Sequence, residues 1–304
     1  MPSTTDDITR GLRQQPASIS PKYFYDQHGS RLFEEITRLP EYYPTRTEAA
    51  LMQRHEADIA RAVGTGRTVV ELGAGNCQKA RMLCRLVQPA CFVGVDISAD
   101  FLKAAVQGLR EDFPGLDARA LGGDMTQGVQ LPADIPRAGR LVFYPGSSIG
   151  NFDPPHALDL LAHMRELVDD DGGLLIGIDL PKDVAVLEAA YDDAAGVTAA
   201  FNRNVLTHVN RLIGSDFDVA QWQHRAFFNH GESRIEMHLE ALADTEVGWP
   251  GGGRRFDRGE RIHTENSYKY PLPVFTAMLA RAGFTQAQAW TDERGWFAVV
   301  HARP

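Results

Sequence analysis

The stretch Glu71-Leu72-Gly73-Ala74-Gly75-Asn76 decides the fold that we expect for this chain. It closes residues 68–72, a run of β-branched and apolar residues that favours a strand. Glycines directly after a strand let the backbone approach a ligand closely, and the helix that follows points its N-terminus at that ligand. A G-x-G pattern alone is common, so the neighbouring segments must decide whether it marks a cofactor site.

Strands and helix-like segments alternate through much of the chain. Further strands are expected at residues 91–97, 118–122, 141–144 and 173–178, and helices at 48–63, 78–87, 98–112, 155–168 and 273–282. This alternation indicates a parallel sheet covered by helices on both faces. Residues 286–291 and 296–302 are separated by a short turn, which predicts a final antiparallel hairpin. We therefore expect an α/β domain with a mostly parallel, seven-stranded sheet.

A second region breaks this rhythm. It contains a long helix-like stretch at residues 183–212, a strand at 234–243 and a loop at Pro250-Gly251-Gly252-Gly253. Near the N-terminus, tyrosines and phenylalanines alternate with prolines, which favours a packed segment over a surface tail. We expect a main domain at residues 48–183 and 268–304, a second α+β domain at 17–47 and 184–267 that binds the substrate, and a mobile lead-in at 1–16.

Composition restricts the class of protein. The 304 residues are 43% hydrophobic and 23% charged, which is typical of soluble globular proteins. The 31 Lys+Arg against 40 Asp+Glu give a net charge of −9, which disfavours nucleic-acid binding. No apolar run approaches the roughly 20 residues of a membrane span, and the polar N-terminus lacks a signal-peptide core. Cys77, Cys84 and Cys91 fit no zinc spacing, so we expect reduced thiols, no metal and a cytoplasmic protein.

Carboxylates follow the next two strands. Asp96 lies roughly twenty residues beyond the glycines, where a carboxylate can accept both hydroxyls of a ribose. Asp124 and Met125 could hold an adenine amino group and its ring face; the alternative is that both aspartates only cap helices. A dinucleotide fingerprint would need a third glycine, which is missing here. The order E-x-G-x-G, Asp, Gly-Asp resembles Rossmann-like, class I methyltransferases that use S-adenosylmethionine.

Longer motifs carry a closer resemblance. The loop Gly146-Ser147-Ser148-Ile149-Gly150-Asn151 follows the fourth strand, where substrates bind in open α/β sheets. Asn151 offers a donor and an acceptor for an amino-acid head group, although a simple turn would also use it. The other motifs are Phe24-Tyr25-Asp26, residues 39–48, residues 190–202, Arg234-Ile235-Glu236-Met237 and residues 264–269. From about residue 17 to the end, the chain resembles the L-histidine Nα-methyltransferases of ergothioneine biosynthesis.

That resemblance implies an activity and a set of residues. The family transfers methyl groups from three S-adenosylmethionine molecules to the α-amino group of L-histidine, which yields hercynine. Matching cofactor positions are Gly73, Lys79, Asp96, Asp124 and Met125. Matching histidine-binding positions are Tyr42, Asn151, Tyr191, Glu265 and Ser267, and the positions that line the pocket are Tyr25, Gly146 and Met237.

The resemblance also implies how these residues share the substrate. Asn151 and Tyr191 would hold the α-carboxylate, and Glu265 and Ser267 the imidazole, with help from Tyr42. Residues two apart on an extended segment point to one face, so Glu265 and Ser267 can satisfy two ring nitrogens together. A solvated strand edge is the simpler alternative for them. Tyr25 would lie near the amine and is our candidate for proton relay.

The glycine loop departs from the family pattern. Family members more often carry Ser or Thr and an acidic residue around Asn76-Cys77-Gln78, so cofactor affinity could differ. Cys77 has no histidine or base nearby in sequence, which favours a small loop residue over a nucleophile. Three alternatives stay open: a methyltransferase for another amine, a non-catalytic S-adenosylmethionine sensor and, as a distant third, a dehydrogenase. We expect a monomer.

Overall fold

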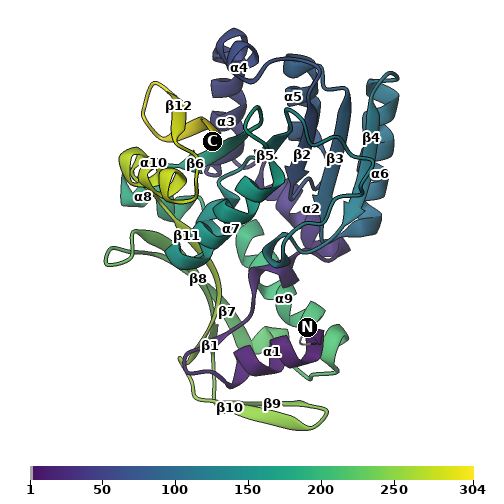
Figure 1. Cartoon of the computed structure of the whole chain (residues 1–304). Coiled ribbons are helices and arrows are strands. Elements are labelled where there is room, and N and C mark those ends of the chain that lie inside the picture. The colour runs from purple at the N-terminus through teal and green to yellow at the C-terminus, as the bar shows by residue number, and fades with distance from the viewer. Residues whose placement is uncertain (1–2) are drawn as a thin grey trace. The chain divides into compact units, whose positions relative to one another are not determined.

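A computed structural model describes residues 3–304 and divides the chain into two compact units. Unit 1 comprises Met1–Tyr43 and Lys182–Tyr268, and unit 2 comprises Pro44–Pro181 and Lys269–Pro304. Each unit is therefore built from two separate stretches of sequence, which Figure 1 allows the reader to follow by colour. The domain boundaries expected from the sequence fall after residues 47, 183 and 267, and those of the structure fall after residues 43, 181 and 268.

Unit 2 contains a seven-stranded sheet within the described residues, in the order β12-β13-β6-β5-β2-β3-β4. The strands are β2 (Thr68–Leu72), β3 (Cys91–Asp96), β4 (Asp117–Gly122), β5 (Leu141–Tyr144), β6 (Gly173–Asp179), β12 (Gln286–Thr291) and β13 (Phe297–Arg303). Strands β2 to β6 are parallel, and β13 runs antiparallel to both its neighbours. The predicted, mostly parallel sheet is confirmed. Its order reverses between β2 and β5, and ligands bind beyond the carboxyl ends of strands at such a point.

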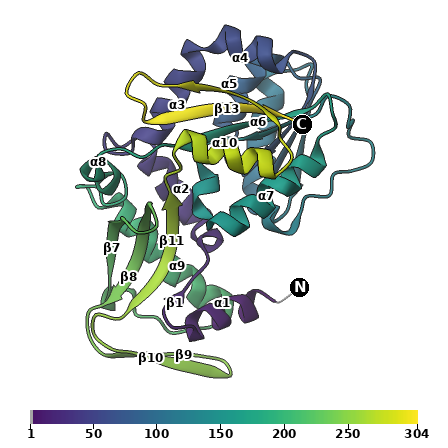
Figure 2. The ribbon, with the colours of Figure 1, turned by 60° about the vertical axis from the view of Figure 1, so that its left-hand side comes forward.

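Helices cover this sheet because its central strands are apolar on both faces. All residues of β2 and β6 are buried. The helices are α3 (Tyr43–Arg54), α4 (Glu56–Val63), α5 (Gln78–Val87), α6 (Ala99–Asp112), α7 (Pro154–Leu167) and α10 (Leu272–Arg281). Ile59, Leu83 and Val106, from α4, α5 and α6, share one hydrophobic core with Phe92 and Phe143 of the sheet. Helices α7 and α10 pack on each other, and α7 also contacts β6 (Figures 1 and 2).

The single helix expected at residues 48–63 is two helices, α3 and α4. The break falls at His55, whose φ of −105° and ψ of 19° leave the helical region. Backbone hydrogen bonds nevertheless continue through it, from His55 N–H to Leu51 O and from Ile59 N–H to His55 O. No glycine or proline stands at this point, so sequence signals for a helix end were absent.

Unit 1 contains a four-stranded sheet in the order β1-β11-β8-β7, and a separate hairpin, β9-β10. The strands are β1 (Ala17–Ser18), β7 (Trp222–Asn229), β8 (Arg234–Ala241), β9 (Thr245–Trp249), β10 (Gly252–Phe256) and β11 (Arg261–Tyr268). Pro250 and Gly251 form the hairpin turn, where a loop was expected. The helix α9 (Val197–Ile213) packs on β7, β8 and α2 (Gln27–Ile36), as Figure 2 illustrates.

Two expectations for unit 1 are corrected. The lead-in is folded from residue 4: α1 (Thr4–Arg13) starts at a Ser3–Asp6 capping box and buries Ile8 and Leu12. Residues 1 and 2 of that segment lie outside the described residues. The long helix expected at 183–212 is α8 (Val184–Ala189) and α9, because Gly196 adopts φ of 74° and the Asp193 carboxylate accepts the Val197 and Thr198 N–H groups.

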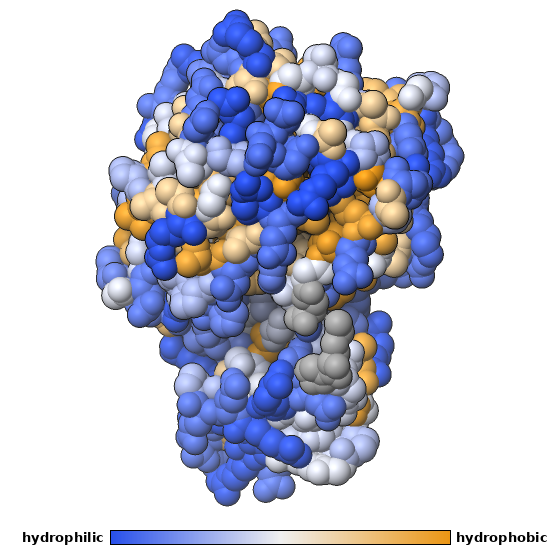
Figure 3. Space-filling view, viewed as in Figure 1, coloured by the Kyte–Doolittle hydropathy of each residue, from blue (hydrophilic) through white to orange (hydrophobic). Residues whose placement is uncertain are grey.

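The surface mixes hydrophilic and hydrophobic residues on the face that Figure 3 shows. The large hydrophobic side chains that are exposed in the described part of the chain are Ile97, Leu212, Leu242 and Val274. Within residues 3–304, none of the helices has both the length and the apolar character needed to cross a membrane.

Candidate functional site

The glycine loop after β2 has the backbone conformation that its glycines predict. Gly73 and Gly75 have φ of 69° and 51°, which other residues adopt only with strain. Cys77 also has a positive φ, of 56°, and precedes the first residue of α5. A Cβ atom on Gly73 would lie 3.3 Å from the Met125 Cε atom, so two predicted cofactor residues adjoin in unit 2.

Asp96 ends β3, Asp124 follows the neighbouring β4, and both order the loops around them. The Asp96 carboxylate accepts the Gly75 N–H at 3.0 Å through Oδ2 and the Ser98 N–H at 2.8 Å through Oδ1. Asp124 accepts the Thr126 N–H at 3.0 Å and so caps a short 3₁₀ helix, Met125–Gln127. Asp124 thus caps a helix, whereas Asp96 ties the glycine loop to the residue that precedes α6. A carboxylate can accept about four hydrogen bonds through its two oxygens, so these contacts leave both residues able to bind a ligand.

Lys79 and Gly146, which are 67 positions apart in sequence (146 − 79), meet at one buried carboxylate. Glu48, only 1% exposed, contacts Lys79 Nζ at 2.7 Å through Oε2 and accepts the Gly146 N–H at 2.8 Å through Oε1. A Cβ atom on Gly146 would lie 2.6 Å from Lys79 Nζ. Gly146 also has φ of 84°, so both space and backbone conformation favour glycine there. Glu48 therefore joins the first turn of α5 to the loop after β5.

The loop after β5 carries Asn151 at its end. A 3₁₀ helix, Ser148–Asn151, follows Ser147, and the Ser147 hydroxyl accepts the Asp179 N–H at 2.8 Å. The Asp179 carboxylate pairs with Lys269 Nζ at 2.8 Å, and both side chains are almost completely buried. This anchoring holds the loop, and with it Asn151, at the carboxyl end of β5 in unit 2.

In unit 1, an aromatic cluster brings together predicted substrate residues from distant parts of the sequence. We define it as Tyr25, Phe33, Tyr42, Tyr191 and Phe201. Three ring pairs pack edge to face. Their ring centroids are 5.7 Å apart for Tyr25 and Phe33, 6.2 Å for Phe33 and Tyr42, and 6.3 Å for Tyr42 and Tyr191. Edge-to-face packing of this kind stabilises aromatic pairs. The cluster presents phenolic groups and ring faces in one place.

Ser267 and Glu265 extend this cluster onto the sheet. The Ser267 hydroxyl lies 2.7 Å from the Tyr191 hydroxyl. On β11, Glu265 pairs with Met237 and Ser267 with Ile235 of β8. Because paired residues point to the same side of a sheet, Glu265, Ser267 and Met237 share one face. Unit 1 thus unites Tyr25, Tyr42, Tyr191, Met237, Glu265 and Ser267, whereas Gly146 and Asn151 belong to unit 2.

Burial raises the pKa of two groups beside the glycine loop, Cys77 and Glu71. Burial, reinforced by Glu71, raises the pKa of the Cys77 thiol to about 12. A thiol that stays protonated is a poor nucleophile, which supports a structural role. Burial raises the pKa of Glu71 well above its usual range; Lys79 opposes the shift, and Glu48 and Asp96 add to it. Glu71 therefore holds its proton more strongly than an exposed glutamate does.

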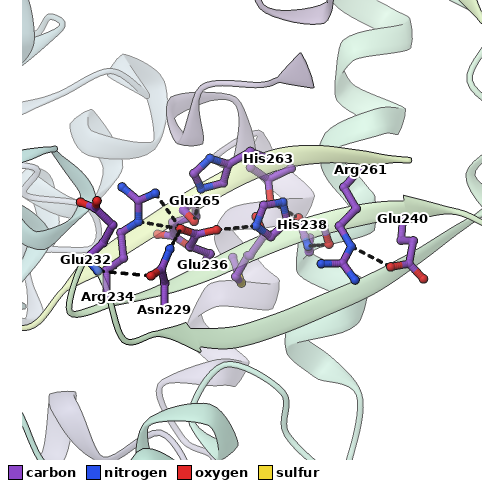
Figure 4. A network of polar contacts seen from close by, with 12 residues as sticks. Asn229, Glu232, Arg234, Glu236, His238, Glu240, Arg261, His263 and Glu265 are labelled. Atoms are coloured by element: carbon purple, nitrogen blue, oxygen red, sulfur yellow. Dashed lines mark hydrogen bonds and ion pairs between the residues drawn. The ribbon is translucent and has the colours of Figure 1, made fainter. Parts of the chain in front are cut away.

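The opposite face of the unit 1 sheet carries the polar network drawn in Figure 4. Glu236, His238 and His263 have possible metal-ligand atoms within 4.8 Å of one another. The Glu236 carboxylate, however, accepts hydrogen bonds from Asn229 and Arg234, each at 2.8 Å. Despite burial, these bonds and one from His238 lower the pKa of Glu236 to about 2. Since Arg234 already neutralises the carboxylate, the geometry favours a network that stiffens the sheet.

Sequence reasoning missed four contributors to these sites. Glu48 stands at a predicted helix start and at the end of the motif 39–48, but the sequence assigns it no role in the site, although it contacts both Lys79 and Gly146. Phe33 and Phe201 complete the aromatic cluster, and aromatic spacing alone cannot separate them from an ordinary core. Ile97 is 46% exposed beside Asp96, where an apolar face could meet a nucleobase. An apolar residue directly after a strand-ending aspartate was a usable signal.

Comparisons with known proteins show the family of the chain. Residues 4–304 match the family described as "Histidine-specific methyltransferase, SAM-dependent". A histidine N-alpha-methyltransferase from Mycolicibacterium smegmatis is 42% identical over 300 residues, covering 96% of this chain and 92% of that protein. Ergothioneine biosynthesis protein 1 from Neurospora crassa is 28% identical, and the match covers 96% of this chain and 34% of that protein.

A solved structure shares the fold. The crystal structure of an S-adenosylmethionine-dependent methyltransferase from Clostridium acetobutylicum matches with a TM-score of 0.50, covering 90% of this chain and 98% of that one. At 12% sequence identity, this likeness concerns the fold alone.

Proposed function

The chain belongs to the S-adenosylmethionine-dependent histidine-specific methyltransferases, and from this premise we propose that it methylates the α-amino nitrogen of L-histidine three times. The product would be hercynine, and the reaction would be the first step of ergothioneine biosynthesis. The observation that carries this proposal is the grouping, in unit 1, of a carboxylate, hydroxyls and aromatic faces that suit histidine: Glu265, Ser267, Tyr191, Tyr42 and Tyr25.

Unit 2 supplies the groups that an S-adenosylmethionine molecule needs. In this proposal Asp96 binds the ribose hydroxyls, and Asp124 binds the adenine amino group. Met125 and Ile97 offer apolar faces to the adenine, and the Lys79 ammonium attracts the cofactor carboxylate. The left-handed Gly73 supports the fit, because a side chain there would press on Met125. The bound cofactor supplies an electrophilic methyl group on a sulfonium.

Unit 1 supplies recognition of the ring. Glu265 and Ser267 share a face, so a carboxylate acceptor and a hydroxyl can meet the two nitrogens of one imidazole. The Ser267 hydroxyl is oriented by Tyr191, and Tyr42 packs on Tyr191. A site built from such groups rejects substrates that leave them unpaired. The role in α-carboxylate binding that the resemblance gives to Asn151 and Tyr191, and the lining role of Gly146 and Met237, remain part of the proposal.

The chemistry demands a neutral amine. An α-amino group has a pKa of roughly 8, so a proton must leave before each methyl transfer. The enzyme's main contribution is to hold the nucleophile in line with the transferred methyl group. Tyr25 is proposed to relay the proton, either directly or through water. Its neighbours Phe33 and Phe201 add ring faces that favour the quaternary ammonium of the product.

The test is to incubate the protein with S-adenosylmethionine and L-histidine and to follow products by mass spectrometry. Successive gains of one, two and three methyl groups on the α-nitrogen are expected. Methylation of other amines, such as tryptophan, tyrosine or dimethylhistidine, without any on histidine would contradict the substrate. Cofactor binding without transfer to any amine would instead indicate a sensor.

The setting of the protein is also part of the proposal. Cys77, Cys84 and Cys91 are free and buried, which suits the reducing cytoplasm. We propose a cytoplasmic monomer, and light scattering after size-exclusion chromatography checks the oligomeric state. A mass near twice the 33.6 kDa of one chain would contradict it.

A further inference from the structure

We propose that Thr264 and Asn202 are positioning residues for histidine recognition, because together they hold a β-bulge that turns Glu265 and Ser267 toward the face of Met237. The inference rests on the proposed function for the role of Glu265, and it adds two residues that need not touch the substrate.

The register shows that β11 contains one extra residue. His263 pairs with His238, but the next pair joins Glu265 with Met237, so Thr264 has no partner of its own on β8. In a regular ladder, Glu265 would lie opposite Glu236, on the face of His238. That arrangement would set two carboxylates against each other. The bulge instead moves Glu265, and Ser267 after it, to the face that packs toward α9.

The bulge is held from the side of α9. Thr264 is 2% exposed, and its hydroxyl lies 2.8 Å from Asn202 Oδ1 and 3.0 Å from Met237 O, two acceptors for its proton. Asn202 is fully buried and donates from Nδ2 to His238 O at 3.0 Å. A bulge disrupts the sheet ladder, and a buried carbonyl without a donor is costly. Thr264 and Asn202 supply these donors.

The same asparagine reaches the Tyr191 segment. Asn202 Nδ2 lies 2.8 Å from His224 Nδ1, and His224 Nε2 lies 2.9 Å from Tyr191 O. Burial lowers the pKa of His224, so the ring is neutral at pH 7, and the backbone bond to Tyr191 and the charges of Asp192 and Asp193 only partly offset this. A neutral ring that accepts at Nδ1 and donates at Nε2 satisfies both contacts. Asn202 thus links two parts of unit 1. One is the bulge that orients Glu265, and the other, reached through His224, is the backbone of Tyr191.

The outer face of the sheet holds the bulge as well (Figure 4). His263 Nε2 donates to the Glu265 backbone oxygen at 3.0 Å. The His263 ring stacks on the His238 ring, with 4.7 Å between the ring centroids. His238 Nε2 donates to Glu236 Oε2 at 2.9 Å. Burial lowers the pKa of both histidines, that of His238 to about 4. Glu265 is therefore fixed through its backbone on one side and through Thr264 on the other.

The decisive experiment compares Thr264→Val with Thr264→Ser. Valine keeps the shape and removes the hydroxyl, so we expect the KM for histidine to rise about tenfold, with the KM for S-adenosylmethionine changed less than about twofold. Serine keeps the hydroxyl and should restore the wild-type KM. The matched control is Thr9→Val, because Thr9 is another largely buried threonine of unit 1, on α1, and the structure pairs its hydroxyl with Asp6 O.

A double-mutant cycle tests whether Thr264 acts through Glu265. In a Glu265→Gln background the carboxylate that would bind the imidazole is already lost. Thr264→Val should then raise the KM for histidine by a smaller factor than in the wild type, because only the positioning of Ser267 is left to disturb. Additive effects of the two substitutions would overturn the proposal. So would an unchanged histidine KM in Thr264→Val.

A second variant tests the proposal independently, in case the Thr264→Val protein does not fold. His263→Phe keeps a ring on His238 and removes the donor to Glu265 O, together with the side-chain contact to Asn266, so a several-fold rise in the histidine KM is expected. A wild-type KM in that variant would contradict the outer contact. Failure of the wild-type protein to methylate histidine would reject the proposed function itself, and this is established before any variant is compared.

Discussion

Glu48, Lys79 and Gly146 show how single residues shape unit 2. A buried carboxylate is tolerable only when it is paired, and Glu48 has both an ammonium and a backbone N–H as partners. Removing one partner leaves the other charge uncompensated, whereas removing both is far less costly. This asymmetry allows the structural role of Lys79 to be separated from its proposed role in cofactor binding.

The variant Lys79→Met should lower the free energy of unfolding by about 1–3 kcal/mol, because the buried Glu48 then lacks its ammonium partner. It should also weaken S-adenosylmethionine binding about tenfold. Adding Glu48→Gln should recover most of the stability, since glutamine still accepts the Gly146 N–H, but not the affinity. Urea denaturation and titration calorimetry measure the two quantities. If the double variant regained full affinity, Lys79 would not contact the cofactor.

At the scale of elements, β6 approaches α3 closely because Gly177 has no side chain. A Cβ atom there would lie 2.0 Å from Glu48 Oε1 and 3.0 Å from the Phe297 ring. Gly177→Ala should therefore displace Glu48 and lower the free energy of unfolding by about 1–3 kcal/mol. Gly115→Ala is the matched control, because nothing lies within 4 Å of its added Cβ. Equal stability of the two variants in urea would contradict this reading.

His301 on β13 makes the stability of unit 2 depend on pH. Burial, with Arg303 and Arg67, lowers its pKa from 6.5 to about 4. The unfolded chain therefore binds a proton first, and the stability that the neutral ring provides is complete above pH 6.5 and is lost as the pH falls toward 4. The loss can reach about 3 kcal/mol. His301→Gln should flatten the decline in urea-unfolding free energy between pH 7 and 4.5, and the exposed His156→Gln should not.

At the scale of the whole molecule, the proposed binding groups are divided between the two units. We expect S-adenosylhomocysteine to slow hydrogen exchange in unit 2 at residues 72–79, 96–98 and 123–126, because a ligand suppresses local opening where it binds. Histidine added afterwards should slow exchange in unit 1 at residues 23–43, 188–196 and 261–268. Exchange measured by mass spectrometry checks both steps. Protection of unit 1 alone by the cofactor product would contradict the division of roles.

Local sequence determined much of unit 2. The run Thr68–Leu72 with Gly73 and Gly75 predicted a strand and a left-handed loop, since β-branched residues favour strands and only glycine enters that region without strain. The alternation of strands and helices predicted the parallel sheet, and its terminal hairpin was recognised as well. In the α+β region local patterns were less informative: β7, β9 and β10 were not predicted, because their half-buried residues give no clear alternation.

Tertiary structure decided how distant residues meet. Glu48, Lys79 and Gly146 converge only because α3, α5 and the loop after β5 fold together, and no local signal encodes that meeting. The bulge at Thr264 likewise depends on Asn202, 62 residues away, which supplies the buried hydrogen bonds that an extra residue in a sheet requires. Motifs carried by resemblance named Glu265 and Ser267, but their shared face with Met237 follows from the pairing of β11 with β8. Sequence determines local conformation, whereas long-range packing determines which chemistry it assembles.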